Sequence, residues 1–379
     1  MDFTYDDEQK ALREAVRGLT TKAYGEFENR RRAVAEAPGF DEGQWARLAE
    51  MGVLGLPFSE DDGGVGAGPV EIGIVCQELG RVLAPEPFLA SVVHAGGLVA
   101  AAGSPEQRAD LLGRLAAGEI VLAAADTSPG GRWSSEAEGV TAARDGDTWT
   151  LTGVRDPVPN GARADHLVVN ASLPDGGTGL FVVEGSAATR ADHAVFDGSR
   201  AARVELSETP AIPLGEPGRD LTATIATISD ITRIMGANQA LGVMQAQVAA
   251  TNAYLKSRKQ FGVTLNTFQA LTFRAADMYV ELELAHSLVD WATMVVAAGS
   301  QEDIADAADR VGLQVARASR HIGQEAIQLH GGIAMTAEYS VGVGTAHLAV
   351  LEMWLGGAHH HLTRLADRVS DHGEVEALA

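Results

Sequence analysis

The residues whose types and spacing could do chemistry are concentrated in one turn, at positions 256–269. Arg258 offers a planar fork of donors that matches a phosphate group, and Phe261 offers a flat apolar surface beside it. Gln269 stands at the far end of the turn, so an arginine and a glutamine could meet one polar ligand there. The alternative is a solvated basic turn without a ligand.

Two helical patterns flank this turn and must position it. Apolar residues recur at spacings of three, four and seven across residues 241–255, and a similar pattern covers residues 268–282. Gly262 is expected to break the first helix, and Thr267 is expected to cap the second. The sequence therefore predicts two long helices joined by the turn that carries Arg258.

The turn resembles a known flavin site. Arg258-x-Gln260-Phe261-Gly262 followed by Phe268-Gln269 resembles the flavin-binding turn of the acyl-CoA dehydrogenases. A second segment, Gln328-Leu-His-Gly-Gly332 followed by Glu338-Tyr339, is similar to the Gln-x-x-Gly-Gly loop of that family. In the family both segments reach across a subunit interface to the FAD of the neighbouring subunit. The resemblance, which covers nearly the whole chain, thus implies FAD contacts at Arg258, Gln260, Phe261, Gln269, Gln328, Gly331 and Gly332.

Composition limits the class of protein and its partners. A chain of 379 residues, 46% hydrophobic and 21% charged, is typical of a globular protein with two or three domains. The net charge of −22 argues against nucleic acid and anionic membranes as partners. Cys76 lies alone in an apolar run, which favours a buried thiol over a disulfide. With neither a signal-peptide pattern nor a long apolar stretch, a cytoplasmic protein is expected.

The periodicity changes twice along the chain and predicts three domains. Residues 1–118 have helical patterns, and the Gly64-x-Gly66 loop among them lacks the preceding strand of a dinucleotide fingerprint. Residues 119–216 contain short alternating segments that predict a small antiparallel β-barrel. Residues 217–379 return to helical patterns long enough for a four-helix bundle. The fold class is α+β, mostly α, which is also the fold that the resemblance implies.

Two barrel segments that face the flavin ring in the family are altered here. In the segment beginning Thr127-Ser-Pro-Gly, Thr127 is retained, but Arg132 and Trp133 replace a small residue and a serine. In the segment 156–161, Pro157 replaces a tryptophan and Pro159 replaces a hydroxyl residue. Proline has no backbone N–H, so two potential donors to a flavin ring are absent. We therefore expect this chain's own flavin platform to be degraded.

The positions that carry the catalytic base in the family are also altered. One of them, counted from Glu338, falls on Leu355, and the other, the residue before Arg233, is Thr232. Neither side chain can abstract a proton near neutral pH. Asp230 and Glu352 are nearby acids that could substitute, although a helix-capping role for Asp230 and a surface position for Glu352 are the alternatives.

Other charged and histidine-rich stretches have plainer interpretations. Consecutive residues on a helix point about 100° apart, so the run at 359–361 cannot bind one metal ion with all three histidines and is expected to be exposed or at an interface. Acidic residues on the C-terminal helices are expected to form a solvated face; they are Glu281, Glu283, Asp290, Asp303, Asp306 and Asp309.

The changes leave three hypotheses. Segments that the family uses to reach a neighbour's flavin are intact, whereas those that serve the chain's own flavin and substrate are changed. The first hypothesis is a flavin-sharing subunit of a heteromeric α2β2 acyl-CoA dehydrogenase, resembling its small subunit. The resemblance implies a sister subunit, an acyl-CoA substrate and electron-transfer flavoprotein as partners. Paired enzymes of this family act on thioesters with bulky or steroid side chains or on dicarboxylic ones, and both alternatives stay open. The second is a homo-oligomeric flavoenzyme with a relocated base. The third is a flavin-free scaffold.

Overall fold

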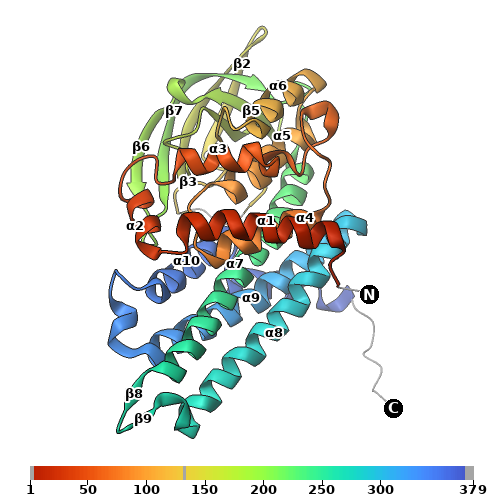
Figure 1. Ribbon diagram of the computed structural model, residues 1–379. Helices are drawn as coiled ribbons and strands as arrows, with labels where there is room; N and C mark the ends of the chain where they lie inside the picture. Colours follow the sequence, from red (N-terminus) through yellow and green to blue (C-terminus); the bar gives the residue numbers. More distant parts are fainter. Residues whose placement is uncertain (1–3, 131–133, 372–379) are drawn as a thin grey trace.

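The computed structural model describes residues 4–130 and 134–371. Helices α1 and α4 cross the middle of the molecule, between the β-barrel on one side and the long C-terminal helices on the other (Figure 1). The helical prediction for the N-terminal region is confirmed. Its longer elements are α1 (Asp7–Tyr24), α2 (Phe27–Ala35), α3 (Glu42–Glu50), α4 (Pro69–Arg81), the π-helix η3 (Phe88–Gly96), α5 (Gly97–Ala102) and α6 (Pro105–Ala116).

Local sequence explains where several of these helices begin. Asp6 and Gln9 form a capping box at the start of α1, and Ser104 and Gln107 form another at the start of α6. In each box the two side chains satisfy backbone N–H groups that have no partner inside the helix. Cys76 lies on α4 and is 1% exposed, so the predicted buried thiol is confirmed.

The central region forms a closed barrel. Its strands are β1 (Leu122–Ala125), β2 (Val140–Asp145), β3 (Thr148–Pro159), β4 (His166–Ser172), β5 (Thr178–Glu184), β6 (Thr189–Ala194) and β7 (Arg200–Pro213). The ring runs β4-β2-β3-β7-β5 and closes through the β4–β5 pairing, while β1 joins β4 and β6 joins β7. The predicted barrel is confirmed, with one difference: β4 pairs in parallel with β1 and β2.

The C-terminal region is built around α7 (Thr222–Ser257). The other helices are α8 (Gln269–Ala298), α9 (Gln301–His330), α10 (Ser340–Leu355) and α11 (Ala358–Asp367). Two glycines let α4 touch α7: a Cβ on Gly80 would lie 2.1 Å from the Gln239 carbonyl oxygen, and one on Gly242 would lie 2.0 Å from that of Gln77. This backbone contact fixes the N-terminal helices on the bundle.

The turn after α7 differs from its prediction in detail. The helix ends at Ser257, and Gly262, at φ +84°, lies in a hairpin of β8 (Lys259–Gln260) and β9 (Val263–Thr264). The prediction that Thr267 caps the second helix is wrong. Its hydroxyl donates to the Thr264 carbonyl at 2.7 Å, and α8 begins at Gln269 without a side-chain cap.

Asp309 and His361 are also placed differently from their predictions. Asp309 is fully buried, not solvated, and accepts from His361 Nδ1 at 3.1 Å and from Arg364 Nε at 3.0 Å. Arg368 completes the cluster. Helix α11 folds back onto α9, where a Cβ at Gly312 would lie 2.4 Å from His361 Nε2. His361 is therefore a buried hydrogen-bond partner of Asp309, and no cluster of three or more metal-ligating side chains occurs within the described residues.

No helix in the described ranges has both the length and the apolar character needed to cross a bilayer.

The Asp309 cluster gives a prediction for stability. Asp309→Asn should lower the free energy of unfolding by about 3 kcal/mol, because it leaves two arginines and a buried histidine without their carboxylate. The loss should appear as a lower denaturant midpoint. Asp306→Asn, on the same helix, removes only a half-exposed pair with Arg310 and should cost less than about 1 kcal/mol. Equal effects of the two substitutions would contradict the proposed role of Asp309.

Candidate functional site

A cleft of about 490 Å³ lies between the barrel, the π-helix η3 and helices α7 and α10. Its size falls in the range of small-molecule sites. Apolar side chains from η3 and α10 form much of the wall, including Leu89, Ala90, Leu351 and Trp354. Barrel residues from the ends of β1, β3 and β7 supply the polar side. Three regions of the chain therefore meet at one cleft.

A histidine and an aspartate lie close together in the wall of this cleft. His94, on η3, lies with its Nε2 atom 3.2 Å from Asp126 Oδ2, just after β1. The His94 ring also lies 6.0 Å from the Trp354 ring, centroid to centroid. Burial raises the pKa of Asp126, but His94 and Arg155 outweigh burial, so the net pKa is below the ordinary value. Asp126 is therefore ionised near neutral pH.

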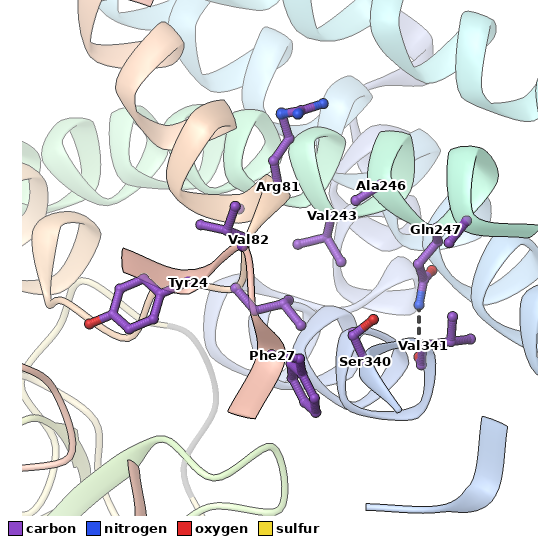
Figure 2. Close-up of a pocket in the computed structure, with 14 residues that line it drawn as sticks. Tyr24, Phe27, Arg81, Val82, Val243, Ala246, Gln247, Ser340 and Val341 are labelled. Carbon is purple, nitrogen blue, oxygen red and sulfur yellow. Dashed lines mark hydrogen bonds between the residues drawn. The ribbon is translucent and has the colours of Figure 1, made fainter. Parts of the chain in front are cut away.

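A buried glutamate occupies another part of the cleft wall. Glu86 is 6% exposed, its Oε1 accepts from the Tyr24 hydroxyl, and its Oε2 has no hydrogen-bond partner among the described residues. Burial raises the pKa of Glu86 to about 7. Tyr24 also lines a smaller cavity of about 140 Å³ beside α7 and α10, where Gln247 donates to the Val341 carbonyl at 3.1 Å (Figure 2). Tyr24 thus lines the smaller cavity and donates to Glu86, which lines the cleft.

A buried aspartate in the β6–β7 connection ties the cleft walls together. Asp197 accepts from His347 Nδ1 of α10 at 2.7 Å, and its backbone carbonyl accepts from Arg30 of α2 at 3.0 Å. Burial opposes ionisation of Asp197, but hydrogen bonds and charge from His347, with help from Ser199, hold its pKa far below the ordinary value. One aspartate thereby joins the barrel, the N-terminal helices and the bundle.

The two positions expected to carry a base both line the cleft. Thr232 donates its hydroxyl to the Ile228 carbonyl at 2.8 Å. Leu355 packs into space left by Gly236, where a Cβ would lie 2.0 Å from Leu355 Cδ1. The Leu355 carbonyl accepts from Arg233 Nε at 2.9 Å. Position 355 is therefore apolar, and the hydroxyl at position 232 is already used in a hydrogen bond within its own helix.

The two substitute acids lie outside the residues that line this cleft. Asp230 is buried well inside α7 and pairs with Arg233 at 2.5 Å and with Arg364 at 3.7 Å. The capping prediction for Asp230 is wrong, since α7 begins at Thr222 and Leu221 holds the cap position. Burial raises the pKa of Asp230, although the two arginines oppose this. Glu352 pairs with Arg320 at 3.4 Å. Neither acid is presented to a ligand in the cleft.

The altered barrel segments meet beside the cleft. Thr127, Pro157 and Pro159 all line it, and the Thr127 carbonyl accepts from the Asp156 N–H at 2.9 Å. Arg132 and Trp133, the other altered positions, lie outside the described residues.

The segments expected to reach a neighbour's FAD lie elsewhere, at one end of the bundle. Figure 1 shows the β8–β9 hairpin at the end of α7 and α8 that points away from the barrel. The two segments adjoin because the Tyr254 ring of α7 lies 4.5 Å from the His330 ring of α9. All the predicted contact residues there are exposed: Arg258, Gln260, Phe261, Gln269, Gln328, Gly331 and Gly332.

At this end of the bundle, the side chains of Arg258 and Phe261 are exposed and available to a ligand. Phe261 is 92% exposed at φ +53°, and within the described part of the chain Arg258 has no carboxylate at ion-pair distance. A Cβ at Gly331 or Gly332 would meet no atom within 4 Å. Side chains and backbone here are open to a molecule outside the chain.

Sequence reasoning missed His94, Asp126, Glu86 and Tyr24. The available signals were weak: one histidine in the apolar run 88–96, and an aspartate directly before Thr127. Their juxtaposition depends on the packing of η3 against β1, which periodicity does not show.

Comparison with known proteins settles the family. Residues 6–119 match the family model "Acyl-CoA dehydrogenase, N-terminal domain", and residues 222–370 match "Acyl-CoA dehydrogenase, C-terminal domain". The chain belongs to the acyl-CoA dehydrogenase family. The recognised family and its fold are thereby confirmed, and members of the family are FAD-dependent oxidoreductases that desaturate acyl-CoA thioesters between the α and β carbons.

Similar relatives cover almost the whole length of this acyl-CoA dehydrogenase homologue. The short-chain specific acyl-CoA dehydrogenase of Clostridium acetobutylicum is 29% identical over 90% of this chain and 92% of its own. A solved variant of the "Tcur3481-Tcur3483 steroid ACAD" is 30% identical, covers 96% of this chain and 98% of its own, and has a TM-score of 0.88. The ChsE4-ChsE5 complex from Mycobacterium tuberculosis is 27% identical, covers 99% and 100%, and also has a TM-score of 0.88.

Glu86 gives a prediction for pH-dependent stability. Its pKa of about 7 in the folded chain, against the ordinary 4.5, means that the folded state keeps a proton which the unfolded state has lost. The free energy of unfolding should therefore fall between pH 4.5 and 7, by on the order of 3 kcal/mol at 1.36 kcal/mol per pKa unit, and level off above. Glu86→Gln should remove this fall in urea titrations across the pH range.

The exposed Glu60 supplies the control. Glu60→Gln should leave the pH dependence as in the unmodified chain. Parallel pH curves for the Glu86→Gln variant and the unmodified chain would contradict the prediction.

Proposed function

We propose that this chain is the flavin-sharing subunit of a heteromeric FAD-dependent acyl-CoA dehydrogenase. It lends FAD contacts across an interface, and a sister subunit supplies the flavin platform and the catalytic base. The observation that carries the proposal is the exposed, unpaired Arg258 beside the exposed Phe261, at the end of the bundle that points away from this chain's own cleft.

The distribution of charge supports this division of labour. The arginines lining the cleft are committed within the chain: Arg30 to the carbonyls of Leu83 and Asp197, Arg200 to Asp192, and Arg233 to Asp230. Lys256, Arg258 and Lys259, by contrast, make no ion pair with any described residue. A dianionic diphosphate is held best by cations that are not already neutralised. The free cations at the hairpin therefore suit a diphosphate better than the cleft does.

The chain's own cleft is poorly equipped for desaturation. Leu355 and Thr232 stand where the base is expected, and neither can accept the α-proton. Pro157 and Pro159 border the same cleft without backbone N–H groups to donate. Thr127 alone remains of the expected hydroxyl residues in these two segments.

Two relatives support assembly with a sister chain. Their names pair two different chains, Tcur3481 with Tcur3483 and ChsE4 with ChsE5, and the first is described as a steroid enzyme. We therefore propose a heterotetramer that acts on acyl-CoA thioesters with bulky or steroid side chains. A neighbour described as an electron transferring flavoprotein of Acidaminococcus fermentans makes such a protein our proposed electron acceptor.

In this proposal, each residue that reaches the FAD of the sister subunit has its own role. When bound, FAD supplies the acceptor for the hydride that leaves the β-carbon. Arg258 neutralises diphosphate charge, and Phe261 covers a flat face of the cofactor. The amides of Gln260, Gln269 and Gln328 orient it, and the open backbone at Gly331 and Gly332 permits close approach.

Flavin content per protomer tests the proposal. The chain should purify without flavin when expressed alone, and co-expression with its sister chain should give a complex with one FAD per two protomers, measured by absorbance after denaturation. Full occupancy in the chain alone would favour a homo-oligomeric flavoenzyme. A flavin-free complex would favour a scaffold.

Arg258 provides a second test within that complex. Arg258→Ala should weaken FAD binding by about tenfold or more, since charge-assisted hydrogen bonds contribute roughly 1.5–3 kcal/mol. Binding is measured by fluorescence titration of the apo complex. Arg219→Ala removes another exposed arginine, in the connection before α7, and should leave affinity unchanged. Unchanged affinity in the Arg258→Ala complex would contradict the assignment.

A further inference from the structure

The polar side chains that remain free in the cleft are neutral. Ser229 and Asn160 line it, and neither side chain makes a hydrogen bond to a described residue. The arginines of the cleft, Arg30, Arg200 and Arg233, are engaged within the chain, and no lysine occurs among the described residues that line it. A phosphate or carboxylate on a ligand would therefore meet no free guanidinium or ammonium group there.

Carboxylates in the same walls add to this preference for a neutral ligand. Asp126 and Asp156 both line the cleft. Asp126 is ionised near neutral pH, and Asp156 lies 3.6 Å from its partner Arg203. An anionic ligand would be placed beside like charges, which is unfavourable, whereas a neutral ligand avoids this repulsion.

One amide in the cleft is held in place by its neighbours. Asp197 accepts from His347 Nδ1 at 2.7 Å, and His347 Nε2 lies 3.2 Å from Gln239 Nε2. His347 and Gln239 both line the cleft. The Gln239 side-chain oxygen makes no hydrogen bond to a described residue and remains accessible. One end of this amide is therefore tied to α10, and the other end is open to a ligand.

A hydroxyl group matches this amide in either protonation state of His347. A neutral imidazole accepts from the Gln239 N–H and leaves the amide oxygen for the ligand, whereas an imidazolium donates to that oxygen and leaves the N–H. A hydroxyl can donate in the first case and accept in the second. A ketone can only accept, so it would lose its hydrogen bond when the imidazole is neutral.

The remaining walls suit an apolar molecule. Leu89, Ala90, Leu351 and Trp354 line a cleft of about 490 Å³, a volume typical of small-molecule sites. Burial of hydrocarbon against these side chains supplies affinity without any need for charge.

We propose that this cleft binds a neutral, largely apolar alcohol, whose hydroxyl group forms a hydrogen bond with the Gln239 amide. The cleft is distinct from the β8–β9 hairpin that carries the proposed FAD contacts. The inference therefore goes beyond the proposed flavin sharing and does not depend on it. Gln239 is the residue that sets the preference for a hydroxyl group.

Three ligands with the same hydrocarbon chain test the chemical class. The full-length chain is titrated by calorimetry with decan-1-ol, with its methyl ether and with decanoate at pH 8. The alcohol should bind with a micromolar dissociation constant, about fivefold or more tighter than the ether, because the ether has no O–H to donate. Decanoate should bind at least about tenfold more weakly than the alcohol, because its charge would be desolvated without a cation.

A glutamine substitution locates the hydrogen bond. Gln239→Leu should abolish the difference in affinity between alcohol and ether, a ratio that is insensitive to changes in the apolar walls because both ligands share them. Gln324→Leu changes an exposed glutamine on α9 and should keep the difference.

Trp354 reports whether the ligand occupies this cleft. Tryptophan fluorescence should change when decan-1-ol is added, and Trp354→Phe should remove most of that change. The proposal is overturned if decan-1-ol does not bind, if decanoate binds as tightly, if alcohol and ether bind equally to the unmodified chain, or if either signature persists in its variant. FAD content is measured independently, so the failure of one proposal leaves the other intact.

Discussion

The cleft depends on the buried carboxylate of Asp197. This side chain sits in a connection between two barrel strands, yet it accepts from His347 of the bundle, and the adjacent carbonyl accepts from Arg30 of the N-terminal helices. Three regions with separate hydrophobic patterns are thereby held at one point. Because an unpaired buried charge is costly, the three walls favour one arrangement, and the cavity between them is a property of their junction and of no single region.

Much of the architecture could be predicted from periodicity because the long elements are locally consistent. The helical pattern over 241–255 lies within α7, and the region 119–216, predicted to hold short strands, contains β1 to β7. The errors occur where tertiary contacts override local rules. Asp309 has the sequence context of a solvated acid, but α11 returns to cover it with His361 and two arginines. Thr267 has the residue type of a cap, but the hairpin takes up its hydroxyl.

The candidate site shows the same limit. The exposed turn around Arg258 could be found in sequence, because its residues are adjacent and are shaped for a ligand outside the chain. His94 and Asp126 could not, because one lies on the π-helix η3 and the other just after β1, and these elements meet only in the folded molecule. The residues proposed to reach a neighbour are close in sequence, whereas the residues that line the cleft are gathered from several elements. The former are accessible to motif reasoning and the latter require a structure.

The tilted contact between the Tyr254 and His330 rings has a consequence for the two segments proposed to reach a neighbour's FAD. Tyr254 lies in the last turn of α7, just before the β8–β9 hairpin, and His330 is the last residue of α9, just before Gly331 and Gly332. The hairpin and the glycine loop are therefore connected through one pair of contacting rings. Burial lowers the pKa of the His330 imidazole, so the contact between the two rings is uncharged at neutral pH. This ring contact couples the hairpin to the glycine loop within the chain. A cofactor grasped by both would therefore be taken up and released as one cooperative event.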